Sequence, residues 1–202
     1  MKQRILLCSL GLVLLLFSSS CIVHSSLIYF DEDTKGVPNL LSNPGFSPYS
    51  LDRDVALLGW TVHTEGIGEG KNPVFIDGRE AYEGNTSLRI DASKNTVTLL
   101  SDAFQVRRYG GYYSRVLARS TQEKGPNITV RFLTFRENGS VYTKFKSKMR
   151  TGREWKKETI SAGFLRPGVS FGRIQIEIPP FSEGSVWLDD AGCWEVHHFR
   201  ID

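Results

Sequence analysis

The sequence predicts an all-β fold, a sandwich of antiparallel strands, and three observations point to it. Short segments alternate apolar and polar residues with the period of two that strands show, most cleanly at 173–178. Turn signals such as Asn138-Gly139 and Pro179-Pro180 separate these segments. Almost no stretch shows the helical period. About ten short strands at this spacing are typical of a single β-sandwich domain.

Length and composition agree with one folded domain in an exported chain. The chain has 202 residues, of which 40% are hydrophobic and 23% charged, as in ordinary soluble globular proteins. The formal net charge is +3, and Lys2 and Arg4 lie in a predicted leader. The remainder is therefore close to neutral, which gives no electrostatic footprint for nucleic acid.

Residues 1–20 have the pattern of a signal peptide. Lys2 and Arg4 precede an apolar core at 5–17, which is short for a membrane span but typical of a secretory leader. The serines that follow, together with Cys21, resemble the lipobox of bacterial lipoproteins, with Ser18 where leucine is usual. This resemblance implies a lipidated Cys21 and a membrane-anchored protein of the cell envelope. Cleavage at the small residues, which would release a secreted protein, is the alternative.

Residues 21–36 are expected to form a tether, kept solvated by the acidic run at 31–33, and the folded domain is expected at 37–202. Cys193 is the only cysteine of that domain, so no internal disulfide is available. A free cysteine in an apolar strand behaves as a small hydrophobic residue. Cys193 is therefore expected to be buried and inert.

The strand candidates are described in chain order by their residue numbers: 87–91, 96–100, 103–106, 112–118, 128–133, 140–145, 155–160 and 173–178. In 128–133 the apolar residues at even positions face the core, and Arg131 faces outward. In 173–178 the isoleucines face inward, while Gln175 and Glu177 face outward.

Two segments near opposite ends of the chain carry a family resemblance. The first is NLLSNPGF at 39–46, followed by Gly59-Trp60, and the second is SVWLDDAGCWEV at 185–196. Together they resemble the opening and closing strands of carbohydrate-binding modules of the CenC-like group. The resemblance spans 38–196 and implies a galactose-binding-domain-like jelly roll, a β-sandwich of two antiparallel sheets. It also implies that the chain binds polysaccharide without cutting it.

The same resemblance implies a structural calcium ion that ties the N-terminal segment to the last strand. Backbone carbonyls of Gly45, Glu83 and Thr86 and the side chain of Asp189 would be its ligands, as suits a hard cation that prefers oxygen. Ser47 stands where the family commonly has an acidic ligand. The alternative is that Asp189 only accepts hydrogen bonds from the N-terminal loop.

Sugar binding in the resembled family takes place on the concave sheet. Aromatic rings stack on the sugar, and planar polar side chains bind its hydroxyl groups. The expected stacking platforms are Tyr112, Tyr113 and Tyr142. The expected hydrogen-bonding residues are Arg131, Gln175 and Glu177. The segment 95–100, where related modules often have a stacking tryptophan, contains no aromatic residue.

The sequence offers little support for a catalytic function. Asp189 and Asp190 are adjacent in a strand and face opposite sides, so they cannot flank one glycosidic bond. No GxSxG, HExxH or Walker pattern is present. We therefore predict non-catalytic binding of a polysaccharide or glycan. The alternatives are a structural or protein-interaction module of the envelope, which would bind an envelope protein, and a small glycan-acting hydrolase or lyase.

Overall fold

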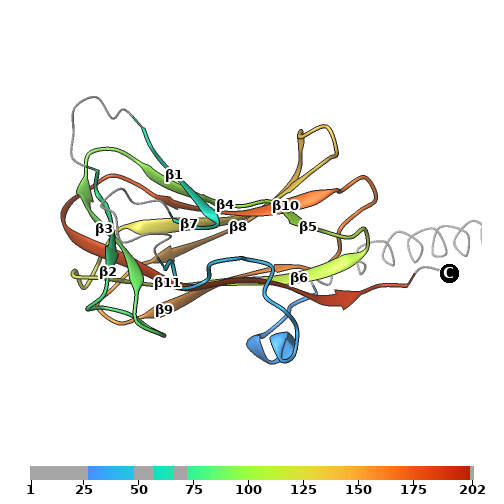
Figure 1. The fold of residues 1–202 in the computed structure, drawn as a ribbon, viewed down its shortest axis with the longest axis horizontal. Coiled ribbons are helices and arrows are strands. Elements are labelled where there is room, and N and C mark those ends of the chain that lie inside the picture. Colours follow the sequence, from blue (N-terminus) through green and yellow to red (C-terminus); the bar gives the residue numbers. More distant parts are fainter. Residues whose placement is uncertain (1–26, 48–56, 66–71, 201–202) are drawn as a thin grey trace, which may run out of the picture.

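A computed structural model describes residues 27–47, 57–65 and 72–200. Two antiparallel sheets lie face to face in it (Figure 1), which confirms the predicted all-β jelly-roll sandwich. The predicted signal peptide, Cys21 and the first part of the predicted tether lie outside the described residues. Within the described residues, no helix has the length and hydrophobicity needed to cross a membrane.

The first sheet has the strand order β1-β4-β10-β7-β8, and β5 pairs with β10 at one end. Its strands are β1 (Trp60–Thr64), β4 (Val97–Ser101), β5 (Phe104–Gln105), β7 (Asn127–Phe135), β8 (Val141–Arg150) and β10 (Phe171–Ile178). Gly139 turns the predicted β7–β8 hairpin with a φ of 78°, a conformation that glycine adopts without strain. The strand β10 ends directly before Pro179, as predicted.

The second sheet has the order β2-β3-β11-β6-β9. Its strands are β2 (Val74–Asp77), β3 (Ser87–Ser93), β6 (Gly110–Ser120), β9 (Lys156–Ala162) and β11 (Phe181–His198). The strand β11 contains the second of the two family-like segments. It pairs with β3 and β6, with a bulge between Asp189 and Gly192. The strand β11 lies in the middle of the sheet. A bulge changes the direction of nearby side chains, so this one can redirect side chains of β11 on the outer surface of the sheet.

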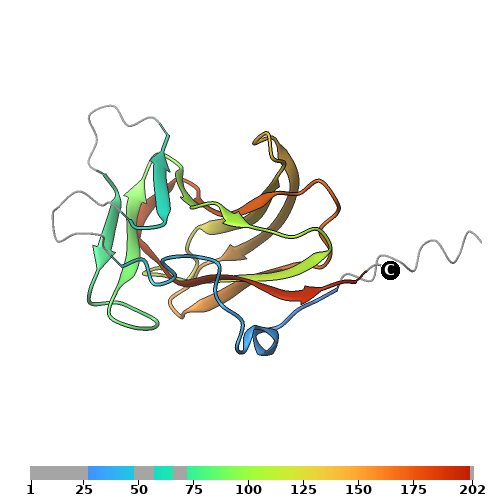
Figure 2. The same cartoon turned by 45° about the vertical axis from the view of Figure 1, so that its right-hand side comes forward.

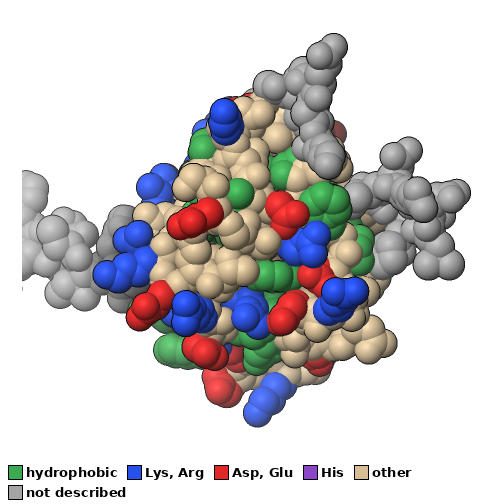
Figure 3. Space-filling view, turned by 90° about the vertical axis from the view of Figure 1, so that its left-hand side faces the viewer, with side chains coloured by type: hydrophobic (Ala, Val, Ile, Leu, Met, Phe, Trp, Pro, Cys, Tyr) green, Lys and Arg blue, Asp and Glu red, His purple; other side chains and the backbone are tan. Residues whose placement is uncertain are grey.

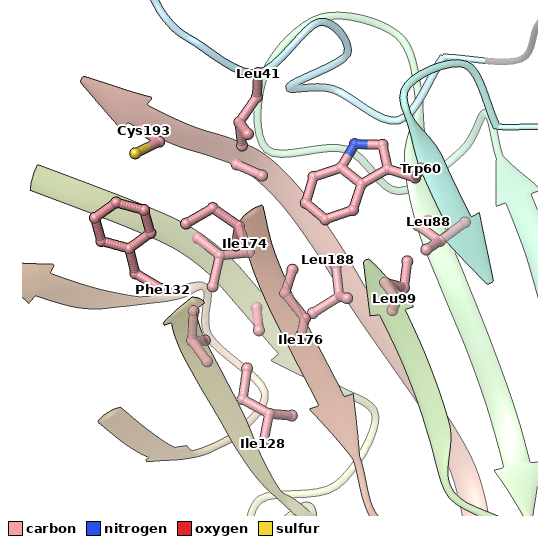
Figure 4. Packing of buried hydrophobic residues seen from close by; sticks show 14 of the residues in the cluster. Leu41, Trp60, Leu88, Leu99, Ile128, Phe132, Ile174, Ile176, Leu188 and Cys193 are labelled. Atoms are coloured by element: carbon pink, nitrogen blue, oxygen red, sulfur yellow. The ribbon is translucent and has the colours of Figure 1, made fainter. Parts of the chain in front are cut away.

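The core fills the space between the sheets (Figure 4). Ile128, Phe132, Ile174 and Ile176 are fully buried, which confirms the predicted inward positions of β7 and β10. Leu188 reaches the same core from β11. Replacing a buried phenylalanine such as Phe132 by alanine costs about 3–5 kcal/mol, because the neighbours fill the cavity only in part.

Tyr112 belongs to this core, and its predicted role as a sugar platform is wrong. Its side chain is 0% exposed, and its ring centroid lies 5.6 Å from that of Phe132. The hydroxyl group accepts a hydrogen bond from the backbone N–H of Arg107 at 2.8 Å. Burial raises the pKa of this hydroxyl group above its usual value. No face of the ring is open to a ligand.

The N-terminal segment from Leu27 onward is attached to the second sheet, so this part of the predicted solvated tether is wrong. The backbone N–H of Tyr29 donates to Ser161 Oγ at 3.0 Å, and its hydroxyl group donates to the carbonyl of Gly163 at 3.2 Å. A Cβ atom at Gly111 would overlap the Tyr29 ring, so glycine there permits the close approach. The 3₁₀ turn η2 (Asp31–Thr34) lies outside the second sheet (Figures 1 and 2).

Charged side chains of both signs are interspersed over the end of the sandwich that lies on the left in Figure 1 (Figure 3). Hydrophobic side chains are visible between them. This end of the molecule therefore carries no extended field of one sign, which agrees with the nearly balanced charge of the chain.

Candidate functional site

The outward surface of the first sheet brings together three of the predicted sugar-binding residues. Arg131 on β7 lies beside Gln175 on β10 in the strand register. Its Nη1 atom donates to Glu177 Oε2 at 2.8 Å and to Gln175 Oε1 at 3.2 Å. Hydrogen bonding and charge from Arg131 hold the pKa of Glu177 below its ordinary value. These three planar groups are therefore held in fixed positions, with Glu177 ionised at neutral pH.

A row of lysines continues this surface onto the edge strand β8. The register pairs Lys144 with Leu133, Lys146 with Arg131 and Lys148 with Thr129. Because side chains in register point to the same face, the three lysines lie beside Arg131. All three are exposed.

Positive charge dominates this surface. Arg173 adds a further cation two residues before Gln175 on β10. Among the outward positions of the described strands β4, β7, β8 and β10, Glu177 is the only carboxylate. We call this surface the basic face: Arg131, Lys144, Lys146, Lys148, Arg173, Gln175 and Glu177.

Aromatic rings lie at one end of the basic face. Phe135 on β7 and Phe171 on β10 are register partners, and their rings stack with centroids 4.9 Å apart and an interplanar angle of 7°. Both are half-buried, and neither belongs to the core cluster. The sequence analysis missed them, although Phe171 continues the outward alternation of β10 and Phe135 that of β7.

Tyr142 lies at the start of β8, near this end. Its hydroxyl group donates to the carbonyl of Pro167 at 3.0 Å, and the Arg136 guanidinium lies 4.8 Å from its ring centroid. The tyrosine is half-buried, on the same sheet as Arg131. Four of the six predicted residues therefore share one sheet.

Tyr113 lies on the opposite sheet from Arg131 and is buried, so its predicted role as a sugar platform is wrong. It belongs to β6, is 2% exposed, and stacks on Trp194 with centroids 6.1 Å apart. Its hydroxyl group donates to Asp31 Oδ1 at 2.9 Å. The N-terminal segment covers this part of the sheet, so a strand position that alternation assigns to an outer surface is nevertheless buried.

The carboxylate of Asp189 joins the last strand to the loop between β2 and β3. Its Oδ2 atom accepts hydrogen bonds from the backbone N–H groups of Tyr82 and Glu83 at 2.7 and 3.1 Å. Its Oδ1 atom accepts one from the N–H of Asp190 at 2.8 Å. The side chain is 0% exposed and forms no ion pair with the described residues. Burial raises the pKa of Asp189 above its ordinary value. The three hydrogen bonds lower the pKa, but their effect is smaller than that of burial.

The other predicted calcium ligands lie around this carboxylate. The Thr86 hydroxyl group donates to the Gly45 carbonyl at 3.2 Å, and Ser47 Oγ lies 3.5 Å from Thr86 Oγ1. A Cβ atom built on Gly45 would lie 3.8 Å from Asp189 Oδ1. The structure shows Glu83 contributing its N–H to Asp189, whereas the prediction concerned its carbonyl. No cluster of three acidic, histidine or cysteine side chains suited to a metal occurs among the described residues.

The oxygen atoms of these residues could coordinate a cation: Asp189 would supply one carboxylate, and the other ligands would be neutral oxygens. A carboxylate offers about four acceptor positions, and three on Asp189 are occupied, so one is free for a cation. The Gly45 carbonyl likewise has a second lone pair beside the one that Thr86 uses. A buried carboxylate without a cationic neighbour would gain from such an ion.

Comparison of the whole fold with known structures shows that it is similar to carbohydrate-binding modules. The module TmCBM61, solved in complex with β-1,4-galactotriose, matches with a TM-score of 0.58 and 18% identity, over 78% of this chain and 99% of that one. A CBM4 module matches with a TM-score of 0.53 and 14% identity, over 76% of this chain and 98% of that one. At these identities the similarity shows a common β-sandwich fold.

The same fold also occurs within a larger enzyme. The enzymatically active domain of tailspike protein 4 from bacteriophage CBA120 matches with a TM-score of 0.58 and 10% identity, over 77% of this chain and 21% of that one. No family model matches the sequence, and no curated protein matches it. Function must therefore be argued from the residues that the fold displays.

Proposed function

We propose that this protein binds a glycan without cleaving it, that the basic face is the binding surface, and that the glycan carries anionic groups. The observation that carries the proposal is the row formed by Gln175, Arg131 and Lys146 across three neighbouring strands, with Glu177 as the one carboxylate on the outward positions of β4, β7, β8 and β10. The fold is that of carbohydrate-binding modules.

The chemistry of this surface matches such a ligand. The guanidinium and lysine ammonium groups can donate hydrogen bonds to carboxylate or sulfate substituents and to sugar hydroxyl groups, and the Glu177 carboxylate can accept hydrogen bonds from sugar hydroxyl groups. The Phe135–Phe171 pair offers an apolar edge for a sugar ring at one end. Glu177 remains ionised because Arg131 lowers its pKa, so it cannot protonate a leaving oxygen as a glycosidase acid does.

The experiment is a glycan array that carries matched acidic and neutral polysaccharides, probed with the wild type and a triple variant. The variant removes the lysine row: Lys144→Ala, Lys146→Ala and Lys148→Ala. Acidic glycans should bind to the wild type, more weakly as salt is raised, because exposed charges are screened. Binding should fall at least about tenfold in the variant, if each lysine contributes about 0.5 kcal/mol or more.

A second triple variant controls for the lost charge. It changes exposed lysines elsewhere: Lys94→Ala, Lys124→Ala and Lys156→Ala. This variant should retain binding. Equal loss of binding in both variants would show that binding depends on net charge and not on the basic face. An array without any signal would favour the alternative function, a structural or protein-interaction module with an envelope protein as partner.

We propose in addition that the protein is exported and anchored to the cell envelope by a lipid on Cys21. The support is the leader sequence, with its apolar core at 5–17 and small residues before the cysteine. Metabolic labelling with a fatty acid should mark the wild type and not Cys21→Ser. An unlabelled wild type found in the medium would favour simple secretion, and a labelled Cys21→Ser protein would show that the lipid is attached at another residue.

We also propose that a structural calcium ion binds beside Asp189. The support is the buried carboxylate without a cationic partner among the described residues, together with the neutral oxygens of Gly45, Ser47 and Thr86 around it. A single carboxylate implies modest affinity, since affinity rises with the number of charged ligands.

A further inference from the structure

A pocket of about 300 Å³ lies on the outer side of the second sheet, across the sandwich from the basic face. We infer that this pocket is a second binding site, and that it takes a neutral sugar. The inference goes beyond the proposed function, because it concerns another sheet, other residues and a ligand of different charge. Its volume is at the lower end of the range for small-molecule sites, which suits one end of a short oligosaccharide.

One wall of the pocket is aromatic. Tyr82, on the loop between β2 and β3, is 53% exposed, although its ring is large and apolar. It meets the ring of Trp155 edge to face, with centroids 5.9 Å apart. Leu117 on β6 also lines the pocket. An exposed aromatic ring beside a half-buried tryptophan gives the apolar face of a sugar ring a surface to stack on.

The opposite wall is polar and fixed in place by ion pairs. Arg115 uses Nη1 to bind Asp31 Oδ1 at 3.0 Å and Nη2 to bind Asp190 Oδ2 at 2.7 Å. Lys157 binds the second oxygen of Asp31. For Oδ1 of Asp190, the described residues provide no hydrogen-bond donor. This oxygen is therefore a free acceptor for a sugar hydroxyl group, on a carboxylate that is already held in position.

The bulge in β11 turns Asp190 into this pocket. Asp190 has a φ of 44°, a left-handed conformation that is uncommon for residues other than glycine, asparagine and aspartate. The irregularity in pairing between Asp189 and Gly192 gives the two adjacent carboxylates different partners. Asp189 holds the backbone of the loop that carries Tyr82, while Asp190 pairs with Arg115 in the pocket. Bulges and unusual backbone angles of this kind concentrate at functional positions.

The charges of the pocket favour a neutral ligand. Asp31, Glu83 and Asp190 line it against Arg115 and Lys157, and both cations are already paired with carboxylates. An acidic sugar would have to displace one of these pairs.

Asp31 does not supply this pocket with the acid that hydrolysis needs. Burial disfavours the ionised form of Asp31, but hydrogen bonds from Lys157, Arg115 and Tyr113 outweigh this and hold its pKa below the ordinary value. Asp31 is thus ionised at neutral pH and cannot act as a general acid.

The experiment follows the indole N–H signal of Trp155 in a ¹H–¹⁵N NMR spectrum, assigned with Trp155→Phe. An array of neutral oligosaccharides that includes β-1,4-galactotriose first selects the strongest binder, which is then titrated into the protein. We expect the Trp155 signal to shift and saturate with the ligand. We also expect Tyr82→Ala to weaken binding at least tenfold, because the stacking platform is lost.

Two controls separate this site from the basic face and from general damage. Phe75→Ala removes another exposed aromatic ring of the same sheet, outside the pocket, and should leave binding unchanged. The lysine triple variant of the basic face should also bind the neutral sugar normally. The inference is overturned if no neutral sugar binds, if the Trp155 signal does not move, or if Tyr82→Ala binds as well as the wild type. Loss of neutral-sugar binding alone would leave the function of the basic face intact, and loss of acidic-glycan binding alone would overturn that function and leave this inference intact.

Discussion

Asp31 Oδ1 lies 3.0 Å from Nη1 of Arg115, and this contact fastens the N-terminal segment to the second sheet. The same carboxylate accepts a hydrogen bond from the hydroxyl group of Tyr113 at 2.9 Å and pairs with Lys157 on the neighbouring strand β9. Asp31 therefore binds side chains from two strands at once. Its position determines both the path of the N-terminal segment and one wall of the pocket.

Replacing Asp31 by asparagine should destabilise the fold by about 1 kcal/mol. Hydrogen bonds to charged groups contribute about 1.5–3 kcal/mol when shielded, and this site is partly exposed, so screening reduces the effect. Urea unfolding measures the change. Glu32→Gln is the matched control, because its exposed side chain has no ion pair with the described residues. Equal stability of Asp31→Asn and the wild type would show that the charge of Asp31 does not stabilise the attachment of the segment.

Acid should weaken the same attachment. The folded-state pKa of Asp31 lies below the ordinary value of 3.8 because hydrogen bonds from Lys157, Arg115 and Tyr113 outweigh the effect of burial. The stabilisation is therefore complete above about pH 5 and is lost as the pH falls through both pKa values. The difference in unfolding free energy between the wild type and Asp31→Asn should shrink from about pH 7 to about pH 2. A difference that stays constant over this range would contradict the ionic role of Asp31.

Alternation within one strand predicted the inward and outward residues of β7 and β10 correctly. It assigned Arg131, Gln175 and Glu177 to outward positions, and the hydrogen bonds between them in the structure show that these positions share one surface. It could not predict the partner strands. Phe135 and Phe171 stack only because β7 and β10 are neighbours in a particular register, and register depends on pairings between segments far apart in the sequence.

The burial of Tyr112 and Tyr113 shows a second limit of prediction from alternation. Tyr112 and Tyr113 are adjacent, so alternation assigns one to each surface of β6, yet both are buried. The core covers Tyr112, and the N-terminal segment covers Tyr113 through Asp31. Composition suggested that the acidic run at 31–33 would remain solvated. Only the folded structure reveals that Arg115 and Lys157 lie where Asp31 can reach them.

Cys193 should resist alkylation in the folded protein. It is fully buried in β11, and burial raises the pKa of its thiol to about 12, so the reactive thiolate is scarce at neutral pH. Iodoacetamide at about pH 8, followed by peptide-resolved mass spectrometry, should modify Cys193 only after the protein is unfolded in denaturant. Rapid modification of the native protein would show that β11 opens locally under native conditions.

Calcium should stabilise the wild type and have no effect on Asp189→Asn, because asparagine removes the one charged ligand of the proposed ion site. At a concentration about tenfold above the dissociation constant, binding to the folded state alone adds about 1.4 kcal/mol, or about 3–6 °C in Tm for a domain of this size. Thermal unfolding in about 10 mM calcium, compared with chelator and with the same concentration of magnesium, measures the effect. Magnesium should act more weakly, since it gives up its water ligands reluctantly.

The control variant Asp102→Asn changes an exposed acidic residue outside this site, and it should respond to calcium like the wild type. If the Tm of the wild type is the same in calcium and in chelator, the hydrogen bonds from Tyr82, Glu83 and Asp190 hold the loop without an ion.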